Sequence, residues 1–265
     1  MKKALVVMIA IALAIGFAMS GCGTKDAPAE PTPTPVPLLV DDMEDGDNRS
    51  NSVDFGGYWF TYDDLADPNL GTSNVWPGSQ TAADKYSYPT PLPTFEMTAP
   101  GITESPLFCA RVSGVVTNTF QFGFLGMGVD LLGDDTVNGG KLPMDLYDEG
   151  FKSLRFWAKS GPNEARSSKV WKIKLTSTYA GLNDGNDQPL DEITVTTDWQ
   201  QFTLPLTGFT QEGWCSNPDS ASATCYTNAL LLTSVIQIQF QTPGANVIGS
   251  GTVVDLMVDK IEFVR

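Results

Sequence analysis

Short segments in which apolar and polar residues alternate recur along the chain, separated by Gly, Pro, Asn and Asp. This alternation has the period of a β-strand, and the segments are rich in β-branched and aromatic residues. Few stretches have the spacing of a long amphipathic helix. A polar, proline-rich interval is predicted as one long loop, at 63–94. The pattern predicts an all-β sandwich, with strands near 38–43, 56–62, 95–99, 107–113, 119–130, 152–159, 168–177, 192–197, 199–206, 234–241 and 252–264.

Four of these predicted strands have an apolar face opposite a face of long, hydrogen-bonding side chains. In the segment 234–241, for example, the apolar face holds Ile236, Ile238 and Phe240. If the four strands are neighbours, one sheet presents a broad polar surface. That surface is either an ordinary solvated sheet face or a binding face. The presence of an indole favours binding, because tryptophan usually stays covered unless it stacks on something. The candidate residues are Arg155, Trp157, Lys172, Lys174, Gln237 and Gln239.

The N-terminus reads as an export signal followed by a tether. Lys2 and Lys3 precede an apolar run at 4–19, which is too short to span a bilayer comfortably. Met19-Ser20-Gly21-Cys22 is similar to a bacterial lipobox, which predicts lipidation of Cys22; an ordinary cleaved signal is the alternative. The Thr/Pro-rich stretch after it favours an extended spacer.

The predicted organisation is therefore a signal peptide at 1–21, a lipidated linker at 22–39 and one folded domain at 40–265. The expected location is the cell surface, at the outer membrane if the host has two membranes.

Charge and composition exclude several classes of function. The signal segment contains two lysines and no acids, so the remainder has 14 basic and 31 acidic residues, a net charge of −17. Such a chain repels phosphate backbones, which makes nucleic acid an unsuitable partner. The sequence has no histidine, which removes Ser-His-Asp and Cys-His catalysis and disfavours catalytic zinc. Glycoside cleavage by paired carboxylates survives this test.

Three cysteines follow the proposed lipidation site. Cys215 and Cys225 flank a polar, turn-rich segment, and an oxidising compartment favours a disulfide between them. Cys109 lies in an apolar alternating stretch, which predicts a buried free thiol. The sequence alone does not settle the pairing.

Several blocks of the chain resemble, in order, a group of β-jelly-roll domains with the galactose-binding-like fold. This group includes the family 11 carbohydrate-binding modules and the domains of complex I intermediate-associated proteins. The blocks cover most of the chain beyond the spacer, and they are VDDMEDGD at 40–47, GGYWFTYDD at 56–64, FWAKS at 156–160, DWQQFTLPL at 198–206, QIQFQ at 237–241 and VDLMVDKIEF at 254–263.

The resemblance implies a protein that binds glucan-type polysaccharide on one sheet face, by aromatic stacking and polar hydrogen bonds. Trp157 is then the stacking platform, and Trp59, Tyr62 and Tyr179 are further candidates. Tryptophans such as Trp59, Trp171, Trp199 and Trp214 are more often core or rim packing residues than ligand contacts. The resemblance also implies a structural Ca²⁺ where the first strand meets the last. Its expected ligands are Asp42, Glu44, Asp47 and Asp259.

Three alternative functions are consistent with these observations. The leading prediction is a non-catalytic, surface-anchored lipoprotein that binds β-glucan-type polysaccharide, with other glycan-processing surface proteins as further expected partners. The alternatives are a jelly-roll enzyme that cleaves glycans with carboxylates, and a structural or adhesive surface lipoprotein without a glycan ligand.

Overall fold

A computed structural model describes residues 36–50, 56–66, 71–77, 95–136, 140–178, 187–213 and 226–265. These residues belong to one compact unit, Pro35–Arg265. The predicted lipid site Cys22, the predicted Cys215–Cys225 disulfide, Tyr179 and Trp214 lie outside the described residues. Within the described part, no helix is long and apolar enough to cross a membrane.

Two antiparallel sheets form a β-sandwich, which confirms the predicted fold class. The first sheet has the order β3-β4-β11-β6-β9, with β1 paired to β11. Its strands are β1 (Leu38–Asp41), β3 (Asn74–Trp76), β4 (Ala110–Val116), β6 (Ser153–Ser160), β9 (Gln200–Pro205) and β11 (Thr252–Val264).

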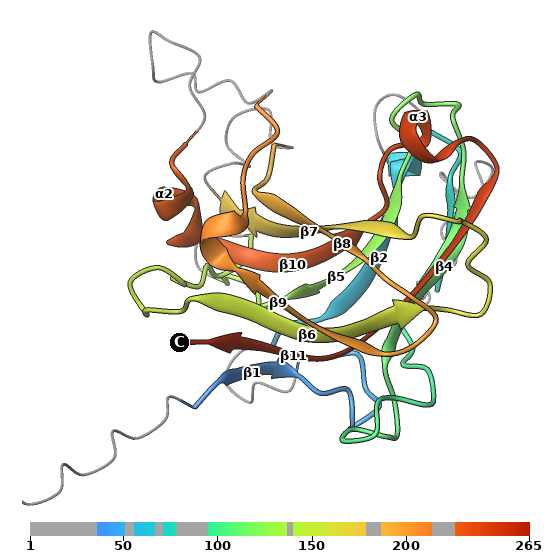
Figure 1. The fold of residues 1–265 in the computed structure, drawn as a ribbon. Helices are drawn as coiled ribbons and strands as arrows, with labels where there is room; N and C mark the ends of the chain where they lie inside the picture. Colours follow the sequence, from blue (N-terminus) through green and yellow to red (C-terminus); the bar gives the residue numbers. More distant parts are fainter. Residues whose placement is uncertain are drawn as a thin grey trace, which may run out of the picture. The chain divides into compact units, whose positions relative to one another are not determined.

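The second sheet has the order β2-β5-β10-β7-β8. Its strands are β2 (Trp59–Asp63), β5 (Leu125–Asp130), β7 (Val170–Ser177), β8 (Leu190–Thr194) and β10 (Val235–Gln241). In Figure 1, β1, β6, β9 and β11 form the lower layer, with β5, β7 and β10 in the layer above them.

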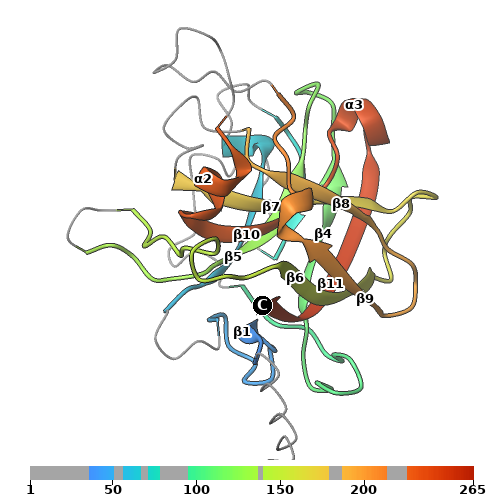
Figure 2. The same cartoon turned by 60° about the vertical axis from the view of Figure 1, so that its left-hand side comes forward.

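In the described part of the chain, short helical segments accompany the strands: η1 (Asp64–Ala66), η3 (Leu206–Gly208), α2 (Asn228–Leu232) and α3 (Ala245–Ile248). The two α-helices stand near opposite ends of the sandwich (Figures 1 and 2).

The core lies between the sheets and follows the predicted alternation. Along β6 and β7, every second side chain is buried. Phe156 from the first sheet meets Phe240 from the second edge to face, with ring centroids 5.4 Å apart. Trp171 and Phe209 are also fully buried. Because each of these side chains removes a large apolar area from water, the interface between the sheets is the main source of stability.

Three local predictions were wrong. The segment 95–99 forms only an isolated bridge, between Thr98 and Cys109. The interval predicted as one loop contains β3, which pairs with β4. A register shift at the start of β10 buries Val235, whereas Ile236 stays partly exposed. Strict alternation does not anticipate such a shift, because a bulge moves every residue before it to the other face.

Cys109 is buried and free, as predicted. Its thiol donates to the carbonyl of Thr98 at 3.1 Å, and burial raises its pKa to about 12. The residue therefore behaves as a packing residue of the first sheet.

Candidate functional site

The predicted polar face is split between the two sheets. β6, with Arg155 and Trp157, belongs to the first sheet, whereas β7 and β10 are neighbours in the second. The assumption that these strands form one sheet was therefore wrong. Alternation along a strand reports which side chains face the core, but it does not report which sheet the strand joins.

On the first sheet, Trp157 lies opposite Asp259 and Gln201 in register and is partly exposed. The Arg155 guanidinium is bound to the Glu262 carboxylate at 2.7 Å. Neighbouring Lys159 covers the ring of Trp199, with its Nζ 4.8 Å from the centroid. These residues share neither a face nor a contact with the predicted residues of β7 and β10.

The outer face of the second sheet combines a row of amides with two rings. Gln237, Gln239 and Gln241 of β10 are all partly exposed, and Gln239 lies in register with Lys174 on one side and Gly128 on the other. At the β2 edge, the rings of Phe60 and Tyr62 are 6.0 Å apart, and Tyr62 packs on Phe124 at 6.1 Å. We call this surface, made by Phe60, Tyr62, Lys172, Lys174, Gln237, Gln239 and Gln241, the glutamine face.

Two glycines of β5 make room for these rings. A Cβ atom on Gly126 would lie 2.7 Å from the Tyr62 ring, and one on Gly128 would lie 2.7 Å from Cζ of Phe60. The two β5 residues on this face therefore place no side chain beside the row of amides. The alternation of Gly126 and Gly128 with Leu125, Met127 and Val129 is a sequence signal for this platform.

Hydrogen bonds hold the amides in place. The Oε1 atom of Gln241 accepts from Nζ of Lys174 at 2.9 Å and from the Tyr62 hydroxyl at 3.4 Å. Nε2 of Gln239 donates to Oε1 of Gln237 at 2.8 Å, and Nε2 of Gln237 donates to Asp130 at 2.8 Å. The row is thereby ordered without a ligand.

Part of the hydrogen-bonding capacity of this row remains unused. An amide side chain has two N–H donors and one oxygen acceptor. Among the described residues, the amide oxygen and the second N–H of Gln239 have no partner. A polar ligand lying along the strand can therefore bond to Gln239 without breaking an existing contact.

The lysines of the face are both constrained. Nζ of Lys172 forms an ion pair with Glu212 at 2.6 Å. Burial, assisted by the charge of Lys172, lowers the pKa of Lys174 to about 8. Burial also raises the pKa of the Tyr62 phenol, which keeps it protonated as a donor. The charge of Lys172 is therefore paired, the lowered pKa of Lys174 weakens its charge, and Tyr62 is a neutral donor.

The other described tryptophans among the candidates are mostly packing residues. Trp59 is buried, and its Nε1 donates to Asp41 at 2.6 Å. Burial raises the pKa of Asp41 to about 7 despite this bond. Trp171 is also in the core. Of the further aromatic candidates that the structure describes, Trp59 and Tyr62, it is Tyr62 that lies on the glutamine face.

Each of the four predicted calcium ligands accepts a hydrogen bond from a backbone N–H. Asp47 accepts from the backbone N–H of Arg49 at 2.6 Å, and Glu44 accepts from that of Leu107 at 2.9 Å. Oδ2 of Asp259 accepts from the N–H of Ile102, while burial raises the pKa of Asp259 to about 7, with a smaller effect from nearby Glu44 and Asp42.

Among the described residues, no group of three or more His, Cys, Asp or Glu side chains could hold a metal ion. The carboxylates are used instead to fix turns around β1. Calcium binding stays a prediction, and the glutamine face does not depend on it.

Solved structures with a similar arrangement include carbohydrate-binding modules and an exo-β-agarase. A family 11 carbohydrate-binding module from Clostridium thermocellum, in complex with a β-1,3-1,4-mixed-linked tetrasaccharide, is 14% identical; the match covers 86% of this chain and 95% of that chain, with a TM-score of 0.48. A family 30 module of a cellulosomal cellulase from the same organism matches at 15% identity over 63% and 81%, with a TM-score of 0.40. An exo-β-agarase matches at 13% over 85% and 25%, with a TM-score of 0.43.

The resemblance to family 11 modules seen in the sequence thus recurs among solved structures. No protein-family model and no curated protein matches the chain. At these identities and TM-scores, the similarities identify neither a ligand nor binding residues for this protein.

Proposed function

We propose that this protein is a non-catalytic polysaccharide-binding protein whose binding site is the glutamine face. The observation that carries the proposal is the ordered amide row with unused capacity at Gln239, beside the rings of Phe60 and Tyr62. Rings stack on the apolar faces of sugars, while amides bond to hydroxyl groups. The expected ligand is a neutral β-glucan-type chain, as the sequence resemblance implies.

The positions of the carboxyl groups support a non-catalytic role. A glycosidase needs a general acid with a raised pKa beside the scissile bond. The described aspartates with raised pKa values are Asp41, Asp64 and Asp259, and all three are fully buried. Asp41 and Asp259 belong to the first sheet, and the Asp64 carboxylate accepts hydrogen bonds from Ser73. On or beside that face, Asp130 and Glu212 are each bound to a lysine. Release of reducing sugar from a polysaccharide would contradict this part of the proposal.

The binding test compares the two sheets. We expect Tyr62→Ala and Gln239→Ala each to weaken binding to soluble β-glucan by about tenfold, the effect of losing one stacking ring or one hydrogen bond to a ligand. Trp157→Ala, on the opposite sheet, is the matched control and should leave affinity unchanged. Affinity electrophoresis against a polysaccharide panel, followed by calorimetry, measures both.

The outcomes separate the alternatives. Loss of binding in Trp157→Ala, with no change in Tyr62→Ala, would move the site to the first sheet. Absence of binding across the panel would contradict the proposal and favour a structural or adhesive lipoprotein without a glycan ligand.

We also propose that the protein is held at the bacterial cell surface by a lipid on Cys22. The support is the lipobox-like sequence, the preceding apolar run and the Thr/Pro-rich spacer. A short spacer of this kind keeps the sandwich away from the membrane, where it can meet an external polymer.

A further inference from the structure

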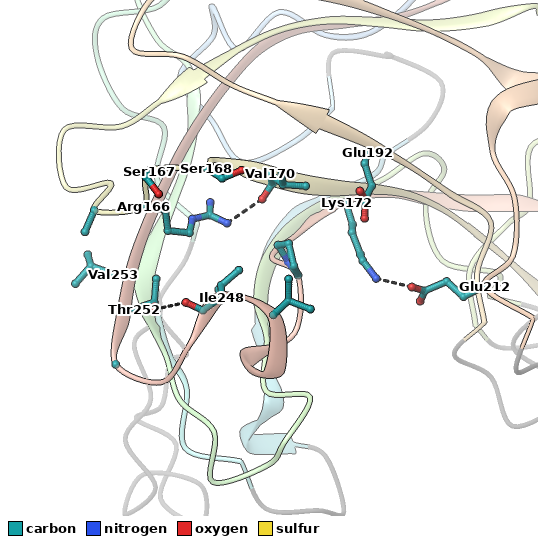
Figure 3. Close-up of a pocket in the computed structure, with 14 residues that line it drawn as sticks. Arg166, Ser167, Ser168, Val170, Lys172, Glu192, Glu212, Ile248, Thr252 and Val253 are labelled. Atoms are coloured by element: carbon teal, nitrogen blue, oxygen red, sulfur yellow. Dashed lines mark hydrogen bonds and ion pairs between the residues drawn. The ribbon is translucent and has the colours of Figure 1, made fainter.

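A hollow of about 730 Å³ lies at the α3 end of the sandwich, beside the glutamine face. Its volume falls within the roughly 300–1,000 Å³ typical of small-molecule sites. Residues from four separate stretches line it, at 165–172, 192, 212 and 243–253, and Figure 3 shows Ser167, Ser168, Lys172, Glu192 and Ile248 around the same space.

The hollow is continuous with the glutamine face because Lys172 belongs to both. Lys172 lies in register with Gln241, the last residue of β10. The chain then continues through Pro243 into α3, and both line the hollow. A ligand that follows the amide row toward Gln241 therefore reaches the hollow next.

The lining of the hollow mixes two kinds of side chain. Apolar groups come from Pro243, Val247, Ile248 and Val253, and Val247 is 71% exposed. Polar groups come from Ser167, Ser168 and Glu192. A lining with both apolar and hydrogen-bonding groups matches the two kinds of surface that a sugar ring presents.

The cations of the hollow are already neutralised. Lys172 is paired with Glu212, as Figure 3 shows. Arg166 is paired with Glu164 at 2.9 Å, and its Nη1 donates to the carbonyl of Val170 at 2.8 Å. An anionic ligand would have to displace these carboxylates, which favours a neutral one.

We propose that the hollow is an additional sugar subsite that extends the glutamine face, so that the protein binds a long internal stretch of a polysaccharide chain more tightly than a short oligosaccharide. This inference rests on the proposed function. It adds that Val247 and the 165–168 turn determine the length of chain recognised, a role that the sheet alone cannot perform.

The test measures affinity for mixed-linkage β-glucan oligosaccharides of increasing length. We expect affinity to rise with length until the chain fills the hollow. Val247→Ala should lower affinity for long chains about threefold to tenfold, the effect of losing up to two buried methyl groups, and leave short chains unaffected. Ser168→Trp, which fills the hollow from an exposed position, should reduce long-chain affinity to the short-chain value.

Leu107→Ala is the matched control, since Leu107 is 55% exposed and lies outside the hollow. Affinity that does not change with chain length, or that stays the same in both hollow variants, would overturn the subsite and leave the glutamine face intact. If no oligosaccharide binds, the proposed function is wrong and so is the subsite. The thermal midpoint of each variant shows whether it has folded.

Discussion

Lys174 lies on the proposed binding face and is expected to lower the stability of the fold. Its ammonium group is largely buried, lies near Lys172 and has one hydrogen bond, to Gln241. Burial disfavours the charged form, which lowers its pKa to about 8 from an ordinary 10.5. Such a residue is poorly suited to a purely structural role, because an apolar side chain would fill the position better.

The pH dependence of stability should show this cost. Between pH 8 and pH 10.5, the unfolded chain keeps the Lys174 proton and the folded chain loses it, so this residue makes the free energy of unfolding rise with pH. Below pH 8 both states are protonated, and the penalty is complete. We expect Lys174→Met to be more stable than the parent at neutral pH, with the difference shrinking as pH rises through this window. Urea unfolding at several pH values measures the difference, and parallel curves would contradict the assignment.

At the scale of single elements, β5 shows how a strand can shape a surface by lacking side chains. Leu125, Met127 and Val129 fill the core, while the outward positions Gly126 and Gly128 leave space for the β2 rings. Glycine weakens a strand interior, so its use at two successive outward positions points to a requirement for close approach.

Alanine at the two glycines should have different effects. A Cβ on Gly126 would lie 2.5 Å from the Phe240 carbonyl oxygen, which is fixed backbone, so Gly126→Ala should destabilise the fold by about 1–3 kcal/mol. At Gly128 the nearest atom belongs to the Phe60 ring, which can move. Gly128→Ala should therefore weaken glycan binding more than it lowers the thermal midpoint. Calorimetry and thermal melts compare the two variants; equal losses of stability would argue against ring displacement.

At the scale of the whole molecule, the two sheets present different outer surfaces. On the first sheet, Asp255 and Asp259 of β11 are fully buried and accept hydrogen bonds from the backbone of Asn163 and Ile102. Connecting segments thus cover the middle of that sheet. The second sheet keeps Gln237, Gln239 and Gln241 partly exposed along its central strand. A long polymer therefore finds its most extended polar surface on the second sheet.

Anchoring is also a property of the whole chain. We expect Cys22→Ser to release the protein from the membrane fraction into the soluble fraction, since lipid attachment at this position would be lost. Metabolic labelling with a fatty acid should mark the parent protein and not the variant. Glycan affinity in solution should be the same for both, because the tether precedes the sandwich in the chain. Retention of Cys22→Ser in the membrane fraction would contradict the lipid assignment.

The sequence by itself determined most of the strands, most of their buried and outward sides, and the fold class, because alternation with period two is a local property that each strand carries. It identified Lys172, Lys174, Gln237 and Gln239 as outward residues of strands that prove to be neighbours. Only the tertiary structure decided that Arg155 and Trp157 belong to the other sheet, and that Phe60, Tyr62 and the glycines of β5 complete the face. Sheet membership depends on pairing between strands far apart in the chain, and alternation within one strand holds no information about that partner.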